Sequence, residues 1–126
     1  MSLYLSLIKN SKNKNGYSIH GLWVQQDEDT NLEYCKPVKF SMKKIKLLRS
    51  DLYKYWRPKH IKDPIKLWAH EWRKHGSCVF TDITQYEYFK KTLDLYKEVI
   101  DKNLNIKKYK RGRHYLIPVS KDFTLL

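Results

Sequence analysis

The chain contains no long apolar run and no stretch of low complexity. No segment approaches the roughly 18 consecutive apolar residues that a membrane-spanning helix requires, so we expect no membrane span. The first ten residues, MSLYLSLIKN, lack the basic start, the long apolar stretch and the cleavage site of a signal peptide. The sequence shows neither repeats nor an interdomain linker, and residues 1–126 are therefore expected to form a single domain.

Cysteine is scarce, with only Cys35 and Cys78 in the chain. Their spacing matches no zinc-binding pattern of the C-x-x-C type. Two free buried thiols would be typical of a cytosolic protein, whereas one disulfide would close a loop of about 44 residues. The spacing by itself leaves both possibilities open.

Acidic residues are half as numerous as basic ones, 13 against 26, which gives a net charge of +13 and a pI near 9.7. Such a charge favours a polyanionic partner, either nucleic acid or an anionic membrane surface, and composition does not choose between them. Hydrophobic residues make up 41% of the chain, which is enough for a core and excludes a compositionally disordered protein.

The apolar periodicity predicts strands near both ends and helices between them. Residues 2–9 and 17–23 alternate as strands do, and residues 114–119 are expected to form a last strand. Three helices are expected: one from Ser41 to Trp56, one from Asp63 to Gly76, and one from Asp82 or Thr84 to Ile100. A polar turn at 10–15, a loop at 27–31 and a basic loop at 107–113 connect these elements. This arrangement predicts an α+β domain.

The second predicted helix carries the most informative cluster of ionisable side chains. Measured around the helix from His70, Lys74 lies at about 40°, Glu71 at about 100° and His75 at about 140°, so all four share one broad face. A single Glu–His pair at this spacing is usually surface decoration, but two histidines, a glutamate and a lysine together are less often accidental. A separate stripe of Ile65, Trp68 and Trp72 is expected to anchor the helix against a sheet, with Leu67 out of pattern near the polar face.

A metal site is the competing interpretation of the same helix. The H-E-x-x-H zinc motif needs its histidines four residues apart, whereas His70 and His75 are five apart. Lys74 would also repel a cation. A metal-dependent hydrolase built on His70, Glu71 and His75 is therefore a weak alternative, and no metal is expected.

The second cluster is SIHGLW at residues 18–23. A histidine on a strand is most often structural. Gly21 allows close approach of a backbone or a ligand, and the ring of Trp23 is suited to stacking on a nucleic-acid base. Strict alternation places Trp23 with Tyr17 and Ile19, on the side opposite His20.

SIHGLW and HEWRKHGSC (70–78), in this order and separated by a helical region, closely resemble the two active-site segments of the ribonuclease T2 family of acid endoribonucleases. The resemblance covers about residues 1–100. It implies an α+β fold in which an antiparallel sheet packs against several helices. It also implies a Cys35–Cys78 disulfide, and hence an oxidising environment, either secreted or in a lysosome-like endomembrane compartment.

The activity implied by the resemblance is endonucleolytic cleavage of single-stranded RNA by transesterification through a 2′,3′-cyclic phosphate, with no cofactor and no obligate protein partner. His75 would be the general base and His20 the general acid. Histidine suits both roles because its ordinary pKa is about 6.5. His70 would hold the phosphate, and Lys74 and Glu71 would stabilise the transition state.

Two departures from the family pattern bear on these expectations. Val24 follows Trp23 where the family usually has proline, which puts the base preference in doubt although Trp23 is still expected to stack on a base. Family members are also considerably longer, so the domain is expected to lack C-terminal strands. The alternative is a catalytically weak relative that binds RNA or another polyanion through Lys107–Arg113. His60 and His114 receive no role and are expected to be structural or surface residues.

Overall fold

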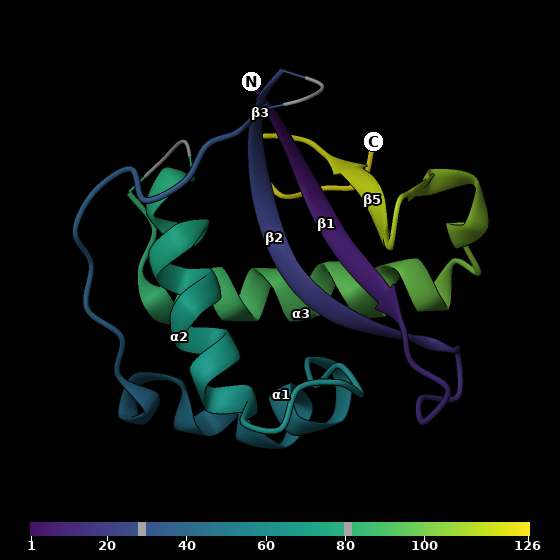
Figure 1. Ribbon diagram of the computed structural model, residues 1–126, viewed down its shortest axis with the longest axis horizontal. Helices are drawn as coiled ribbons and strands as arrows, with labels where there is room; N and C mark the ends of the chain where they lie inside the picture. Colours follow the sequence, from purple (N-terminus) through teal and green to yellow (C-terminus); the bar gives the residue numbers. More distant parts are fainter. Residues whose placement is uncertain (28–29, 80–81) are drawn as a thin grey trace.

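The computed structural model describes residues 1–27, 30–79 and 82–126 (Figure 1). Its five strands form one antiparallel sheet in the order β3-β2-β1-β5-β4. The strands are β1 (Ser2–Lys9), β2 (Tyr17–Asp27), β3 (Thr30–Asn31), β4 (Lys110–Arg111) and β5 (His114–Val119). The predicted α+β class is confirmed. The loop predicted at 27–31 lies partly outside the described residues.

The first strand, β1, lies at the centre of the sheet, and its alternating leucines are buried in the core. Leu3, Leu5 and Leu7 are each 1% exposed or less. β1 pairs with β2 on one side and with β5 on the other, so the C-terminal strand is inserted beside the N-terminal one. Strand β5 continues from β4 through a two-residue turn that begins at Gly112, whose φ of +64° suits glycine.

The helical region between the strands differs from its prediction at one point. The helix expected from Ser41 to Trp56 is divided into a 3₁₀ segment, η1 (Met42–Leu48), and α1 (Arg49–Tyr55). The backbone of Ile45 is non-helical, with φ −120° and ψ 17°, and buries the Ile45 side chain completely. Ser41 stands at the predicted N-terminal position, but its side chain makes no capping hydrogen bond.

Helices α2 (Pro64–Lys74) and α3 (Gln85–Asp101) begin as predicted. Asp63 caps α2 by accepting hydrogen bonds from the amides of Ile65 and Lys66. Thr84 and Glu87 form a reciprocal capping box at the start of α3. Helix α2 ends at Lys74, and Gly76 begins a short 3₁₀ turn, η2 (Gly76–Cys78).

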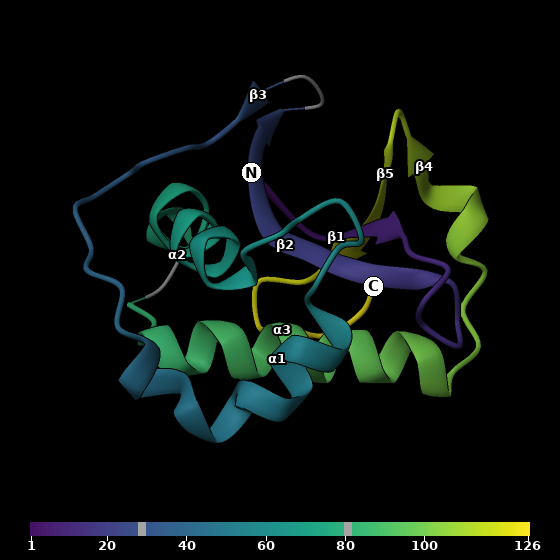
Figure 2. The same cartoon turned by 60° about the horizontal axis from the view of Figure 1, so that its bottom comes forward.

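Helix α3 runs beneath the sheet, while α2 stands beside β2 at one end of it (Figures 1 and 2). Tyr88, Phe89, Tyr96 and Val99 of α3 are 1% exposed or less and form the floor of the core, whereas Tyr86 is 37% exposed. No described helix has the length and apolar character needed to cross a membrane. This packing places the C-terminal end of α2 beside β2. The ionisable residues predicted for the site gather there.

Candidate active site

Tryptophans fix helix α2 against the rest of the molecule. Trp68 is fully buried and Trp72 is 5% exposed, and each indole N–H donates a hydrogen bond to a backbone carbonyl, Trp68 to Trp56 and Trp72 to Lys39. Ile65, predicted on the same stripe, is instead 37% exposed, and Leu67 is buried. The anchored helix therefore presents its polar face to β2 with little freedom to rotate.

A bulge in β2 sets the direction of His20. The pairing with β1 passes from Ser6–Gly21 to Leu7–Ile19, so His20 has no partner of its own in the register. The bulge interrupts the alternation on which the prediction for this strand relied, and it brings the rings of His20 and Trp23 edge to face, with centroids 5.4 Å apart. Trp56 donates from its indole N–H to the His20 carbonyl at 2.9 Å, which fixes the bulged backbone.

Glu71 lies at the centre of the site. Its Oε1 atom accepts a hydrogen bond from Trp23 Nε1 at 2.8 Å, and it lies 3.8 Å from His20 Nδ1 and 4.0 Å from His75 Nε2. The carboxylate is only 1% exposed. One oxygen atom thus lies near two of the three histidines that the sequence singled out, His20 from β2 and His75 from the C-terminal end of α2.

The pKa values in this cluster follow from burial opposed by mutual attraction. Burial raises the pKa of Glu71, but the two histidines and the Trp23 hydrogen bond together outweigh it and leave the pKa below its ordinary value. Burial lowers the pKa of His75 to about 4, although Glu71 opposes this shift. At neutral pH the site therefore contains an ionised Glu71 and a neutral His75.

Trp23 covers His75. The two rings are stacked with centroids 5.0 Å apart and an interplanar angle of 24°, and His75 is only 2% exposed. The indole therefore covers one face of the His75 ring and contributes to its burial. In this arrangement Trp23 contacts the ionisable residues themselves.

His70 and Lys74 lie at the edge of the cluster. His70 is exposed, and its ring centroid is 6.4 Å from that of Tyr34. Lys74 Nζ forms an ion pair with Glu33 at 3.2 Å, at the surface. The structure thus divides the predicted residues into a cluster around Glu71 Oε1 (His20, Glu71 and His75) and a pair at its edge (His70 and Lys74).

The structure adds a residue that sequence reasoning missed. His114, at the start of β5, lies 4.9 Å from His20 and 4.9 Å from Trp23, ring centroid to ring centroid. Burial and the neighbouring His20 lower its pKa to about 4. Its position beside the site depends on the pairing of β5 with β1, a contact between the two ends of the chain that no local pattern reveals.

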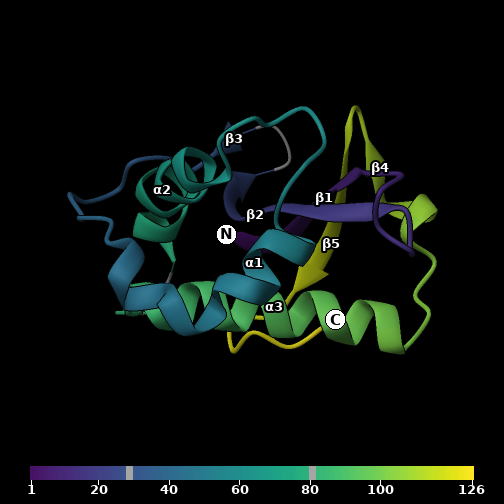
Figure 3. The same cartoon turned by 90° about the horizontal axis from the view of Figure 1, so that it is seen from below.

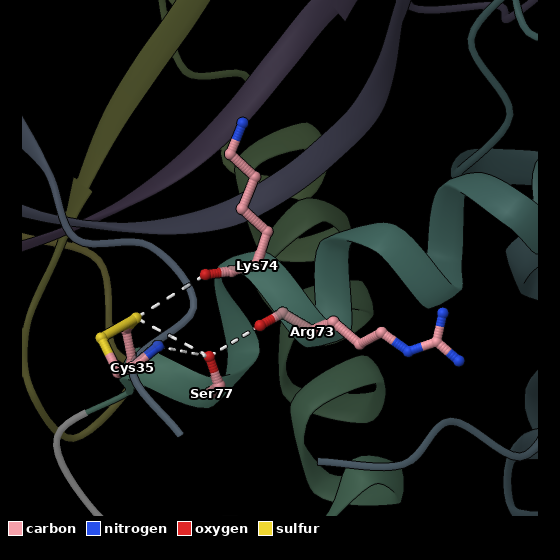
Figure 4. Close-up of a disulfide and its surroundings, with 5 residues drawn as sticks. Cys35, Arg73, Lys74 and Ser77 are labelled. Atoms are coloured by element: carbon pink, nitrogen blue, oxygen red, sulfur yellow. Dashed lines mark hydrogen bonds between the residues drawn. A yellow bond between two sulfur atoms is a disulfide. The ribbon is translucent and has the colours of Figure 1, made fainter. Parts of the chain in front are cut away.

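A disulfide joins Cys35 to Cys78 and holds the segment before η1 against the end of α2 (Figure 4). Ser77 supports it, since its hydroxyl accepts from the Cys35 amide at 3.1 Å and donates to the Arg73 carbonyl at 2.7 Å. The Tyr34 amide also donates to the Lys74 carbonyl at 2.8 Å. The disulfide implied by the family resemblance is therefore present, and it positions Glu33 beside Lys74.

Within residues 1–27, 30–79 and 82–126, no group of three or more His, Cys, Asp or Glu side chains is arranged to hold a metal ion. The chemistry that the site offers is proton transfer, because two imidazoles lie within 4.0 Å of one carboxylate oxygen. Lys74 and His70, at the edge of the cluster, can contact an anion.

The sequence model of the Ribonuclease T2 family matches residues 4–111. Mouse ribonuclease T2-A is 38% identical over 99 residues, a match that covers 74% of this chain and 36% of the mouse protein. The chain thus spans little more than a third of this relative's length.

Solved structures show the same similarity. Ribonuclease MC1 from bitter gourd seeds is 29% identical, with a TM-score of 0.65, over 77% of this chain and 57% of that one. An RNase-related protein from Calystegia sepium is 22% identical and shares the fold, with a TM-score of 0.73 over 99% of this chain and 88% of that one.

Proposed function

The chain belongs to the ribonuclease T2 family, and from this membership we propose that it cleaves single-stranded RNA by transesterification, through a 2′,3′-cyclic phosphate and without a metal ion. The observation that carries the proposal is the placement of His20 and His75 near the same atom, Glu71 Oε1, at 3.8 and 4.0 Å. Two imidazoles that meet at one site can remove a proton and supply one in the same step.

In the first step, His75 takes the proton of the 2′-hydroxyl as O2′ forms a bond to phosphorus. The bond from phosphorus to O5′ breaks, and His20 donates its proton to O5′. In the second step the roles are exchanged: His20 takes a proton from water as the water oxygen forms a bond to phosphorus, and His75 returns its proton to O2′ as the bond from phosphorus to O2′ breaks. Burial supports His75 as the base, because a pKa of about 4 keeps it neutral at any higher pH.

Glu71 and Lys74 would stabilise the charges that develop during these steps. An ionised Glu71 favours the protonated form that each histidine passes through, because its carboxylate lies within 4.0 Å of both rings. Lys74 is held at the surface by Glu33, and a phosphate group can replace that carboxylate as its partner. The exposed His70 is suited to contact the same phosphate.

The proposal requires Trp23 to move. His75 is only 2% exposed, so a 2′-hydroxyl can reach its ring nitrogen only when the residues that cover it, the stacked Trp23 among them, move aside. The displaced ring would then offer its face to a base, the role expected from the family resemblance. The loss of the hydrogen bond to Glu71 is the local cost of this motion.

The burial of the site also favours a second candidate, a relative that binds RNA but cleaves it weakly. His75 is 2% exposed and Glu71 is 1% exposed, so a substrate must displace Trp23 before any chemistry begins. If that displacement is rare, RNA would bind the basic surface and remain intact. Since the chain carries a disulfide, we propose an oxidising compartment for either candidate, either outside the cell or within the endomembrane system.

The test uses one RNA oligonucleotide and the matching DNA in excess EDTA, with the unmodified protein and its His75→Ala and His20→Ala variants. The proposal expects cleavage of RNA only, 2′,3′-cyclic phosphate ends identified by mass spectrometry, and a loss of at least about a thousandfold in each variant. Intact RNA that still binds the unmodified protein would establish the second candidate. Cleavage that persists in both variants would overturn the two-histidine mechanism.

A further inference from the structure

A basic groove of about 650 Å³ lies beside the candidate active site. Lys9 at the end of β1, Lys59 and His60 from the loop between α1 and α2, Lys110 of β4 and Arg113 of the β4–β5 turn line it. No Asp or Glu is among the described residues that line it. In Figure 3 that loop and the tip of the β4–β5 hairpin rise on the same side of the sheet. The groove thus brings together cations from three separate parts of the chain.

The positive charge of this groove is not neutralised locally. Lys9, Lys59, Lys110 and Arg113 are exposed, and none of them forms an ion pair with a carboxylate in the part of the chain that the structure describes. Other surface lysines, such as Lys90 and Lys97, are paired with aspartates. Four unpaired cations around one concave surface concentrate positive potential there and favour an anionic ligand.

The groove lies near the general acid of the proposed reaction. Arg113 directly precedes His114, whose ring lies 4.9 Å from that of His20. His60, which also lines the groove, interacts electrostatically with both His20 and Arg113, and burial together with these neighbours lowers the His60 pKa. An anion in the groove would therefore lie next to the His20 side of the site, away from the surface pair formed by Lys74 and Glu33.

We propose that this groove binds the backbone phosphates of the RNA strand on the 3′ side of the cleaved bond. The direction rests on the proposed function, in which His20 protonates O5′, because the leaving strand must then pass His20. The contact would be independent of sequence: Tyr115, the one Phe, Tyr or Trp among the described lining residues, is only 3% exposed and offers no ring for a base. Lysine and arginine contacts to phosphate give affinity without reading bases.

The binding test measures the affinity of a fluorescent 12-mer oligodeoxynucleotide, which lacks the 2′-hydroxyl and cannot be cleaved by this chemistry, by anisotropy over a salt series in EDTA. The groove variant carries Lys59→Gln, Lys110→Gln and Arg113→Gln. The matched control carries Lys43→Gln, Lys44→Gln and Lys46→Gln on η1, which has the same loss of charge at the other end of the molecule (Figure 1). Circular dichroism melts establish that both variants are folded.

The slope of log affinity against log salt should fall by about 2 in the groove variant, since each lost phosphate contact on a single strand removes about 0.7. The control should keep the slope of the unmodified protein. Equal losses in both variants would overturn the proposal in favour of diffuse attraction. Binding to anionic phospholipid vesicles that the oligonucleotide does not displace, with no loss of oligonucleotide affinity in the groove variant, would assign the groove to a membrane surface instead.

The direction of the strand is tested by cleavage. DNA oligonucleotides with a single ribonucleotide are extended by six nucleotides on either the 3′ or the 5′ side of the only cleavable bond. The 3′ extension should raise kcat/KM by at least tenfold in the unmodified protein, and the groove variant should lose this gain. A gain from the 5′ extension alone would overturn the assigned direction. If no substrate is cleaved, the proposed function fails, while the binding series still decides whether the groove binds a nucleic-acid backbone.

Discussion

Gly21 and Glu71 are packed so closely that no side chain fits between them. A Cβ atom built on Gly21 would overlap Glu71 Oε1 and would lie 2.6 Å from Trp23 Nε1. The glycine of the β2 bulge therefore allows the carboxylate of α2 to reach the strand that carries His20. The backbone conformation of Gly21 does not require glycine, since its φ is not positive. The requirement is for space.

Gly21→Ala should consequently damage the site more than the fold. The new methyl group must displace Glu71 from its position between the two histidines, and a displacement of about 1 Å can lower a rate by about a hundredfold. We expect kcat on an RNA oligonucleotide to fall by this factor or more. The thermal midpoint should fall by only a few degrees.

Gly76→Ala is the matched control for this prediction. A methyl group there would overlap the Trp72 ring, so it strains the packing of α2 without contacting Glu71. If the two variants lose activity in the same proportion as they lose stability, Gly21 acts through folding and the prediction is wrong.

The burial of His75 predicts where the acid limb of the activity profile lies. As a general base His75 must be neutral, and burial sets its pKa to about 4, so kcat/KM should rise with pH through about pH 4. Trp23→Ala would uncover the imidazole and return its pKa toward 6.5. The limb should then move to higher pH by at least one unit, which steady-state rates and an NMR titration of the His75 ring can follow. An unmoved limb would mean that Trp23 is not what shields His75.

Local patterns could predict much of this site because its two segments are each continuous in the sequence. The periodicity of α2 placed Glu71, Lys74 and His75 on one face, and the Asp63 cap and the buried Trp68 and Trp72 followed the same pattern. Such arguments need only the geometry of a single helix.

Contacts between distant parts of the chain could not be predicted in this way. The bulge at His20 depends on how β1 pairs with β2, and a strictly alternating strand places Trp23 on the wrong side. His114 reaches the site only because β5 pairs with β1. Glycine beside a strand histidine was the available hint of the bulge, since glycine within a strand often marks one.

From the lowered pKa values of His75 and His114 we also expect the folded chain to be less stable in acid. Both have a pKa of about 4 in the folded chain, below the ordinary value of 6.5. The unfolded chain therefore binds more protons between these values, so the free energy of unfolding should fall as the pH falls from about 6.5 to about 4. For the well-buried His75, the pKa shift sets an upper limit of about 3 kcal/mol on this fall in the free energy of unfolding.

Urea denaturation at pH 7.5, 6, 5 and 4.5 measures this dependence. His114→Gln should make the stability less dependent on pH across this window, because it removes one of the two groups that resist protonation. A free energy of unfolding that stays constant, or rises, between pH 6.5 and 4.5 would contradict the assigned burial of both histidines.

Removing the disulfide should destabilise the fold and loosen the surface around Lys74. The cross-link closes a loop of about 44 residues, for which chain entropy predicts about 4 kcal/mol. In a domain of this size we expect the midpoint of the Cys35→Ser, Cys78→Ser variant to fall by roughly 10–20 °C. Glu33 would lose its fixed position 3.2 Å from Lys74, so the affinity for RNA at the edge of the site should change as well.

Ser77→Ala separates the cross-link from the hydrogen bonds around it. This variant loses the contacts of the Ser77 hydroxyl to the Cys35 amide and the Arg73 carbonyl but keeps the disulfide, so it should cost only about 1–2 kcal/mol. Reduction of the unmodified protein should reproduce the double-serine variant, because it removes the same covalent bond. If reduction leaves the melting midpoint unchanged while Ser77→Ala lowers it, the non-covalent contacts hold this segment and the cross-link contributes little.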